Sequence, residues 1–355
     1  MSQLFKAIFS ACLLLIWFVS PVAAQDYNFS QFWENRTYYN PAFVGLHEGE
    51  WNNNLTYRRL WPNLDGDFST INFSSDFKTY NNYGIGLNVI SSDEGAGLIK
   101  STSVALAYSW RGYISKERGF FFQLGVKGSY NHEKLNSNKW IFSGQLDPIY
   151  GNIYPDYNGV GVIKKQQNFW DFSLGALFSL PIRLPNYNVI ENYIGFSVDH
   201  FTRPKNNFLE DKQKIPMKLG VQWYASVPTS LYSLNKKSRL QVRPGIIFEN
   251  QGDKLLSKAS FNNLLIGADV ATDPLFAGIW YSSQLLSKSD KNYKALVFKM
   301  GLKFDSDSKR FQYKLTYTYD MSLGNLVKST EGSHEIGISV VYRFNARYNY
   351  NIFSF

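Results

Sequence analysis

The sequence predicts an all-β protein: a transmembrane, antiparallel, up-and-down β-barrel of about 14 strands in an outer membrane. Three observations lead to this fold class: an export signal, strands that alternate apolar and polar residues, and an aromatic content of 17%. The alternation is clearest from Phe311 to Met321, where every second residue is large and apolar and the residues between are polar. Such a strand has one apolar and one polar face. In a barrel the apolar face meets lipid and aromatic side chains gather at both membrane interfaces.

Residues 1–24 have the features of a secretory signal peptide. Lys6 supplies the positive charge, Ala7 to Val19 form an apolar stretch too short to span a bilayer as a helix, and Val22-Ala23-Ala24 supply the small residues that precede cleavage. An uncleaved anchor and acylation at Cys12 are the alternatives, and the small residues favour cleavage after Ala24. Since Cys12 is the only cysteine, the mature chain is expected to contain no disulfide, thiolate metal site or cysteine nucleophile.

The rest of the chain is expected to form one membrane domain with short flanking segments. Residues 25–50 are predicted to be an N-terminal periplasmic segment or a plug, residues 51–345 the transmembrane barrel, and residues 346–355 a C-terminal tail. The strands are expected to reach the roughly 9–11 residues that a tilted membrane strand needs. They are predicted at Trp51 to Leu60, Asp67 to Lys78, Asn82 to Ser92, Leu98 to Tyr113, Gly119 to Glu133, Asn168 to Ile182, Val189 to Thr202, Ile215 to Pro228, Ser238 to Asn250, Ala259 to Ala271, Pro274 to Leu286, Tyr293 to Asp305, Arg310 to Ser322 and Ser333 to Asn345.

An even number of strands places both ends of the barrel on the periplasmic side. The longest connection, Lys134 to Gln167, then falls among the outward loops, as expected for an outer-membrane barrel. It is dense in turn-forming residues and tyrosines, and it is interpreted either as a constriction or binding surface at the mouth or as a mobile surface loop. A soluble sandwich would also alternate, but the number and length of these strands disfavour it.

The polar residues do not form a catalytic or nucleic-acid-binding pattern. The four histidines lie far apart and none has metal-ligand spacing. Asp199 precedes His200, but neighbours in a strand point to opposite faces and cannot pair directly. The formal net charge of +9 is spread along the chain. In an exported protein this charge indicates anionic lipid headgroups, an acidic partner or a charged lumen rather than nucleic acid. We therefore expect no enzyme activity and no cofactor.

Short motifs before and around the first strand carry a family resemblance. They are Phe29-Ser30-Gln31, Asn40-Pro41-Ala42 with Gly45, Tyr57-Arg58, and Trp61-Pro62. Together with Tyr342-Arg343-Phe344 in the last strand, they resemble the PorP/SprF family of Bacteroidetes outer-membrane proteins, which is associated with type IX secretion and gliding. The likeness extends over the mature length. The chain departs from the family pattern at Val44, where a small residue is common, and in the ten residues after the last strand.

The resemblance implies an accessory role in exporting or anchoring a large surface adhesin or gliding-type protein. The implied partners are outer-membrane lipids, a secreted adhesin with a C-terminal sorting domain, and type IX secretion components, namely a ring-forming lipoprotein and its partner. The motif residues then become candidates for docking, and Asn40-Pro41-Ala42 could be a lid, a plug or a simple turn. The alternative functions are an outer-membrane channel or small-solute transporter, whose lumen geometry the strand number does not decide, and a purely structural surface anchor.

Overall fold

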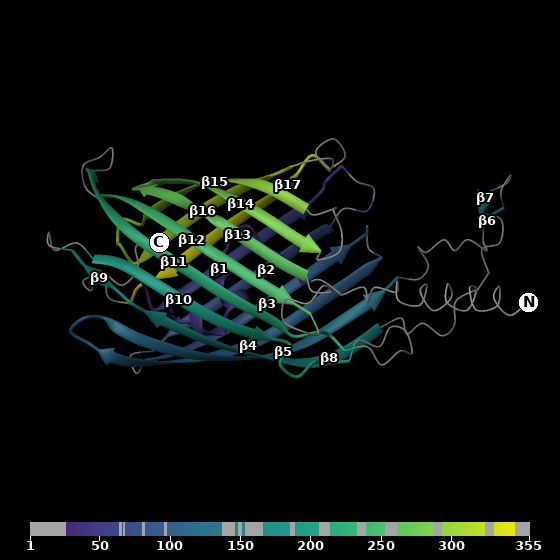
Figure 1. The fold of residues 1–355 in the computed structure, drawn as a ribbon, viewed down its shortest axis with the longest axis horizontal. Helices are drawn as coiled ribbons and strands as arrows, with labels where there is room; N and C mark the ends of the chain where they lie inside the picture. Colours follow the sequence, from purple (N-terminus) through teal and green to yellow (C-terminus); the bar gives the residue numbers. More distant parts are fainter. Residues whose placement is uncertain are drawn as a thin grey trace, which may run out of the picture.

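The protein is a closed antiparallel β-barrel. The computed structural model describes residues 26–63, 66, 68–79, 82–95, 98–136, 146–147, 151–152, 166–184, 189–205, 214–232, 239–252, 261–286, 293–323 and 330–344. In this part of the chain, 14 long strands pair with their sequence neighbours, and pairing of the first with the last closes the ring (Figure 1). They are β1 (Trp51–Leu60), β2 (Phe68–Lys78), β3 (Tyr83–Glu94), β4 (Ile99–Ser115), β5 (Phe120–Leu135), β8 (Gln166–Ser179), β10 (Val189–Asp199), β11 (Lys218–Tyr232), β12 (Arg239–Gln251), β13 (Phe261–Thr272), β14 (Leu275–Leu286), β15 (Tyr293–Asp305), β16 (Phe311–Ser322) and β17 (Ser333–Tyr342).

Three two-residue strands lie outside this ring. They are β6 (Leu146–Asp147), β7 (Gly151–Asn152) and β9 (Ile182–Arg183). The first two pair with each other, and β9 extends one end of β10. Among the described residues, no helix has the length and apolar character that a membrane crossing requires.

The fold class and the strand number predicted from the sequence are confirmed. Each predicted segment overlaps one long strand, and β1 and β15 match the prediction at both ends. Four segments differ by three or more residues at one end or both, namely those of β8, β10, β11 and β17. β8 ends at Ser179 rather than Ile182, because Pro181 has no N–H for the ladder. β11 continues past Pro228, because a register shift between Pro228 and Tyr232 accommodates the proline.

The two faces of the barrel wall have opposite polarity. Along β1 the side chains of Asn52, Asn54, Thr56 and Arg58 are buried, while the alternate side chains, including Tyr57, are exposed. In the described chain 39 large hydrophobic side chains are exposed, most of them at alternate positions of the strands, so the outer wall is apolar. A membrane supplies the environment that such a surface needs, and the polar residues face the lumen.

The two ends of the barrel differ in the length of their connections. At one end, which we call the short-turn end, are the connections 79–82, 116–119, 180–188, 233–238, 273–274 and 306–310, together with the chain entry into β1. At the other, the long-loop end, are the three longest connections, 136–165, 200–217 and 252–260, with the shorter ones 61–67, 95–98, 287–292 and 323–332. Most of the predicted long outward loop, the signal peptide and the C-terminal tail lie outside the described residues. The ends of β1 and β17 meet at the short-turn end, where Trp51 pairs with Tyr342.

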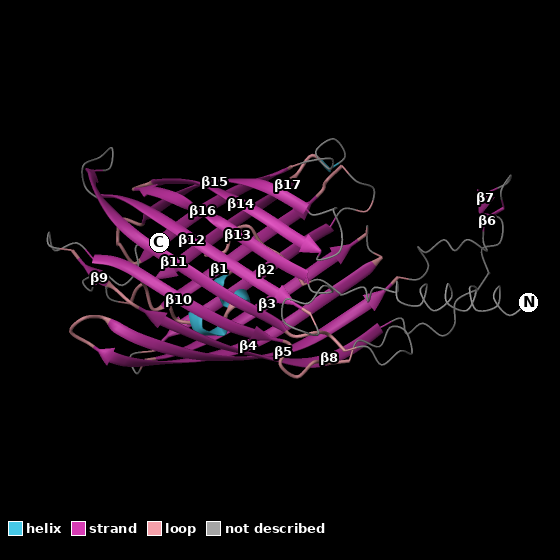
Figure 2. Cartoon of the chain, in the orientation of Figure 1, coloured by secondary structure: helices cyan, strands magenta, loops and turns pink. Residues whose placement is uncertain are grey.

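The lumen is occupied by the chain that precedes β1. Residues 26–50, which we call the plug, contain a single helical turn, α2 (Arg36–Tyr39), and the 3₁₀ turn η1 (Pro41–Phe43). Figure 2 shows these turns inside the ring of strands. Aromatic and aliphatic plug residues form the centre of the protein's main hydrophobic cluster: Phe29, Phe32, Trp33, Tyr38, Tyr39, Ala42, Phe43 and Leu46. The core of this protein therefore lies inside the barrel, between the plug and the wall.

Candidate functional site

The plug runs through the lumen from the long-loop end to the short-turn end. At the long-loop end, Asp26 forms ion pairs with His200 and Lys218, which flank the connection after β10. At the short-turn end, the Glu50 backbone N–H donates to the Tyr342 carbonyl at 3.0 Å, and the chain then enters β1. The segment before the first strand thus spans the length of the lumen.

Three plug carboxylates each lie between two cations of the wall. Asp26 lies 2.9 Å from both His200 Nε2 and Lys218 Nζ. Glu34 lies 2.8 Å from Lys314 Nζ and 3.8 Å from Lys299 Nζ. At the third position, the Glu48 carboxylate is 2.8 Å from Arg343 Nη2 and 3.3 Å from Lys303 Nζ. These contacts fix the plug at three positions along the lumen.

The surrounding cations outweigh the effect of burial on the first two carboxylates. Burial alone would favour the neutral acid, but His200 and Lys218 hold the pKa of Asp26 well below its usual value. Burial likewise opposes ionisation of Glu34, and Lys299 and Lys314 lower its pKa. Both plug carboxylates are therefore charged at neutral pH.

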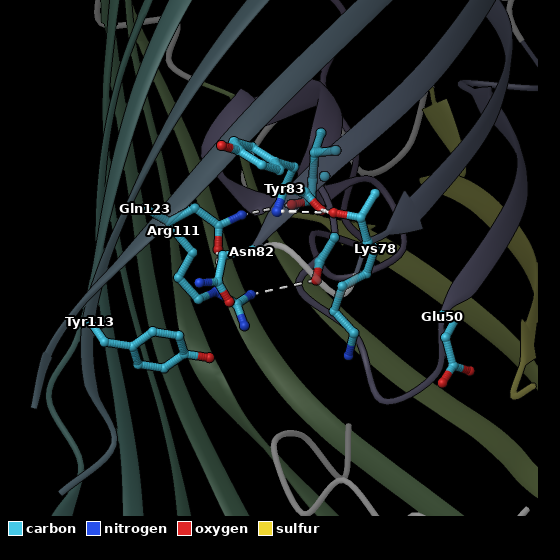
Figure 3. Close-up of a pocket in the computed structure, with 11 residues that line it drawn as sticks. Glu50, Lys78, Asn82, Tyr83, Arg111, Tyr113 and Gln123 are labelled. Atoms are coloured by element: carbon cyan, nitrogen blue, oxygen red, sulfur yellow. Dashed lines mark hydrogen bonds between the residues drawn. The ribbon is translucent and has the colours of Figure 1, made fainter. Parts of the chain in front are cut away.

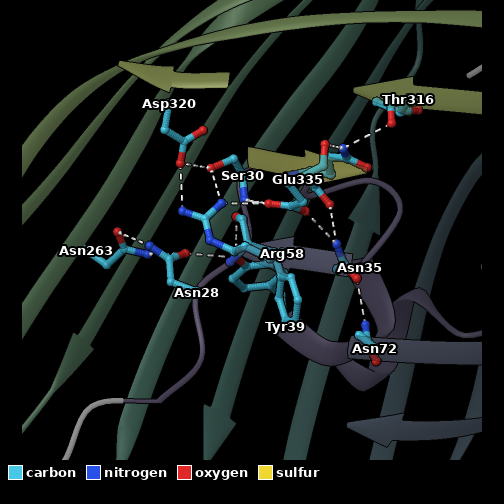
Figure 4. A network of polar contacts seen from close by, with 12 residues as sticks. Asn28, Ser30, Asn35, Tyr39, Arg58, Asn72, Asn263, Thr316, Asp320 and Glu335 are labelled. Atoms are coloured by element: carbon cyan, nitrogen blue, oxygen red, sulfur yellow. Dashed lines mark hydrogen bonds and ion pairs between the residues drawn. The ribbon is translucent and has the colours of Figure 1, made fainter. Parts of the chain in front are cut away.

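A buried ion network joins the plug to β1, β16 and β17 (Figure 4). The Arg58 guanidinium donates to Asp320 at 2.6 Å and to Glu335 at 2.7 Å. Ser30 connects this network to the plug: its hydroxyl donates to Asp320 at 2.7 Å and accepts from Arg58, and its N–H donates to Glu335 at 2.7 Å. Gln31 adds a side-chain donation to the Glu335 carbonyl at 2.9 Å. Two carboxylates and one guanidinium are thus buried together, and plug donors also bind both Glu335 oxygens and one oxygen of Asp320.

The turn Asn40-Pro41-Ala42 packs on the side of the barrel opposite to the ion network, and there it lies close to the backbone of the wall. Asn40 Nδ2 donates to Gln222 Oε1 at 2.9 Å and to the Phe196 carbonyl at 3.1 Å, while its Oδ1 accepts from the Ala42 N–H at 2.8 Å. The wall beneath the turn is made of glycines on β5, β8 and β10, namely Gly125, Gly175 and Gly195. A Cβ at the first would overlap the backbone of Pro41 and Ala42, and one at the second would overlap Asn40 Oδ1. The turn fits only because these positions have no side chain.

Gly45 holds the plug backbone close to Lys78 of β2 and Gly84 of β3. Its φ of +74° lies in the left-handed region that favours glycine, and its N–H donates to Asp76 Oδ2 at 2.8 Å. The preceding Val44 carbonyl accepts from Gln123 at 2.7 Å and from Ser109 at 2.8 Å. Val44 thus lies at a backbone junction between the plug and strands β4 and β5.

The remaining motif residues lie away from the plug interface. Tyr57 is 42% exposed on the outer face of β1, where it pairs across strands with Ile71 and Ile336. Trp61 follows β1 at a φ of +52° and contacts the rings of Phe68 and Tyr293 edge-on. Pro62 lies in the adjoining turn. The structure therefore gathers Ser30, Gln31 and Arg58 in one network and Asn40-Pro41-Ala42 in a second contact. Phe29 lies in the core between them, and Tyr57 faces outward.

Sequence reasoning missed the residues of the wall that receive the plug. Asp320 and Glu335 are about 300 positions from Ser30, and their role depends on barrel closure. In the sequence, each of the two is a charged residue at a lumen-facing position of a strand. A buried charge at such a position is expected to have a partner of opposite charge. Sequence reasoning correctly excluded a direct Asp199–His200 pair: His200 instead binds Asp26 and Asp171, and Asp199 lies 3.2 Å from Lys127.

Cavities remain between the plug and both ends of the barrel. One of about 360 Å³ lies at the long-loop end, beside Asp26, Lys127 and His200. Another of about 610 Å³ lies at the short-turn end, beside Arg111 and Tyr193. In the described part of the chain, no group of three or more His, Cys, Asp or Glu side chains is arranged to hold a metal ion.

These features define an outer-membrane β-barrel whose lumen holds its own N-terminal segment. The sequence model of the family described as "Type IX secretion system membrane protein PorP/SprF" matches residues 22–340, and the chain belongs to this family. The match includes the whole plug and every barrel strand except the last two residues of β17. The family resemblance and the outer-membrane location predicted from the sequence are thereby confirmed. A comparison with curated protein sequences gives no match.

Solved structures with similar folds come from several bacterial species. The Ralstonia pickettii toluene transporter TbuX is 9% identical, with a TM-score of 0.47 over 86% of this chain and 92% of that one. A Pseudomonas aeruginosa FadL homologue is 11% identical, with a TM-score of 0.43 over 83% and 89%. The translocator domain of the autotransporter NalP from Neisseria meningitidis is 13% identical, with a TM-score of 0.35 over 89% and 96%. Nothing about function follows from likenesses at these values.

Proposed function

We propose that this protein is an accessory of type IX secretion that docks, exports or anchors a large surface adhesin or gliding-type protein at the outer membrane. Family membership supports a role in this secretion system. The observation that carries the finer proposal is the plug, which fills the middle of the lumen and is fixed by buried ion pairs. A barrel with a fixed plug offers its rims and loops as rigid docking surfaces.

The partners proposed for this role are proteins on both sides of the membrane. A secreted adhesin would be recognised through its C-terminal sorting domain. On the periplasmic side, the ring-forming lipoprotein of the secretion system and its partner would contact the barrel, and lipids would surround it. Outer-membrane barrels carry short periplasmic turns and longer outer loops, so we assign the short-turn end to the periplasm.

Surface labelling tests this orientation. The mature chain is expected to contain no thiol, so a single introduced cysteine reports its own side of the membrane. Lys205→Cys lies at an exposed position of the long-loop end, and Ser308→Cys lies at an exposed position of a short turn. On intact cells an impermeant maleimide should label the first and not the second. The reverse result would invert the assignment of the two ends.

Gene deletion tests the proposed role. The deletion strain should lose one surface protein, measured by mass spectrometry of shaved cell surfaces, and keep normal permeability to small solutes. Affinity capture of the tagged protein from native membranes should co-purify that surface protein and secretion components. Normal export of every surface protein together with loss of uptake of one nutrient would refute the proposal.

The second candidate is an outer-membrane channel or small-solute transporter. The observation in its favour is that cavities of about 360 and 610 Å³ approach the plug from opposite ends. A path would open if the plug moved. Large, steady conductance of the purified protein in planar bilayers would favour this function, whereas a closed barrel would favour docking.

A further inference from the structure

The cavity at the short-turn end has an uneven distribution of charge. Its volume is about 610 Å³, and it lies between the turn that joins β4 to β5 and the connection from β8 to β10. Four cationic side chains and two carboxylates line it: Arg111, Lys116, Arg118 and Arg183, with Glu117 and Glu191. The excess of positive charge distinguishes it from the cavity at the long-loop end, where carboxylates outnumber lysines.

Arg111 is the innermost of these cations and the most buried. Only 7% of the residue is exposed, and its guanidinium lies over the Phe121 ring, 4.5 Å from the centroid. It donates to Gln123 Oε1 at 3.0 Å and to the Gly45 carbonyl at 3.5 Å (Figure 3). None of the ion pairs among the described residues involves Arg111. The described residues give Arg111 only neutral partners, so an anion in the cavity would supply the ion pair that this guanidinium lacks.

A second cavity continues the first along the rim. It has a volume of about 120 Å³ and shares Asn82, Arg111 and Tyr113 with the larger one. Figure 3 shows these three side chains lining the same cavity as Lys78 and Glu50, close to where the plug joins β1. The guanidinium of Arg111 therefore lies where two openings meet, and an elongated ligand could contact it from the short-turn side.

The surroundings of the cations favour a peptide over a small inorganic anion. Phe121, Tyr113 and Val189 supply apolar surface to the larger cavity. The short strand β9, which contains Arg183, pairs within the described chain only with β10, so its other edge presents backbone groups at the rim. An extended peptide can use such an edge for main-chain hydrogen bonds while a side chain or terminus enters the pocket.

We propose that this cavity binds a carboxylate group of an extended peptide segment from a protein partner on the short-turn side. Arg111 forms the inner ion pair with the carboxylate, and Lys116 and Arg183 attract it at the entrance. The inference rests on the proposed function for the partner being a protein. The binding test below uses no secreted adhesin. A negative result there leaves the proposed function standing, and failure of the deletion test leaves the peptide-binding site standing.

Fluorescence anisotropy of the purified full-length protein tests the proposal. The probe is a fluorescein-labelled hexapeptide, Gly-Ser-Gly-Ser-Asp-Phe, with a free C-terminus. The matched probe has Asn in place of Asp and a C-terminal amide. The acidic peptide should bind saturably and the neutral one at least tenfold more weakly. Arg111→Gln should weaken binding of the acidic peptide at least tenfold. Arg310→Gln, an exposed arginine at the same end but outside the cavity, should leave it unchanged.

A second variant keeps the test valid if Arg111→Gln does not fold. The double variant Lys116→Gln with Arg183→Gln changes exposed side chains, and it should weaken binding of the acidic peptide about threefold or more. Equal binding of the two peptides, or equal loss in the Arg111 and Arg310 variants, would overturn the proposal. Displacement of the peptide by inorganic phosphate at lower concentration than by acetate would also overturn it, because the site would then be one for phosphate.

Discussion

Two opposite walls of the lumen hold the plug by different physical means. The charged wall, formed by β1, β15, β16 and β17, binds it through ion pairs and charge-assisted hydrogen bonds centred on Arg58 and Glu34. The glycine wall, formed by β5, β8 and β10, receives the Asn40-Pro41-Ala42 turn in the space that Gly125, Gly175 and Gly195 leave free. In the closed strand order these groups of strands lie across the ring from each other. One wall thus depends on charge balance and the other on shape.

The difference determines what each wall tolerates. A buried ion network tolerates coordinated replacement but not removal of one partner, because a lone buried charge is strongly unfavourable. A backbone contact has no charge to balance, but a single added methyl group meets atoms that cannot move aside. Substitutions on the two walls should therefore destabilise the protein for different reasons, and different second substitutions should restore its stability.

The largest expected effect is on the charged wall. Arg58→Met removes the cation between Asp320 and Glu335 and leaves two carboxylates buried without it. We expect the free energy of unfolding to fall by about 3–5 kcal/mol, measured by urea titration in lipid vesicles. Adding Asp320→Asn and Glu335→Gln should restore much of the loss. A triple variant no more stable than Arg58→Met would show that the charge argument is wrong.

The ion pair at the long-loop end should make part of the plug's stability depend on pH. Burial opposes the charged imidazole, but Asp26 and Asp171 outweigh it and raise the pKa of His200 to about 10. The ion pair therefore stabilises the folded protein fully below about pH 6.5, the pKa of a histidine in the unfolded chain. This stabilisation is lost as the pH rises to about 10, the pKa of His200 in the folded protein. His200→Gln should destabilise the protein by about 1.5–3 kcal/mol at pH 6 and much less at pH 10.

The control for this pH dependence is the same substitution in an Asp26→Asn background. With one carboxylate removed, the loss of stability caused by His200→Gln should be smaller and vary less with pH. A loss that grows with rising pH would contradict the raised pKa.

The glycine wall should respond to one methyl group. Gly125→Ala places a Cβ against the backbone of Pro41 and Ala42, and we expect a loss of about 1–3 kcal/mol. Gly128→Ala, on the outer face of the same strand, is the matched control, because its Cβ would approach only the Phe172 ring, at 3.3 Å. Gly125→Ala should therefore have a lower melting temperature than Gly128→Ala. Equal melting temperatures would mean that the plug shifts freely on this wall.

The contrast between the walls also explains what the sequence could predict. Strand number and most strand bounds followed from period-two alternation, because a membrane barrel imposes it on every strand. The motifs around Ser30 and Asn40 drew attention to the plug, but their partners could not be assigned. Glu335 and Gly175 acquire their roles only when the ring closes. A charged residue on the inner face, or a glycine in the middle of a strand, indicates a position with a special environment. Neither indicates which residue of the plug it will contact.

The smallest expected effect comes from the outward neighbour of Arg58. Tyr57 belongs to the same sequence motif, but it faces away from the plug between Ile71 and Ile336. Tyr57→Leu keeps an apolar side chain on the outer wall and should change the free energy of unfolding by no more than about 0.5 kcal/mol. Display of the surface protein that the proposed function assigns to this barrel, measured by immunoblot of the cell surface, should then separate two roles. Normal display would mean that the Tyr57-Arg58 motif acts through Arg58 and its contact with the plug. Loss of display in a fully stable variant would instead place a docking contact on the membrane-facing surface of β1.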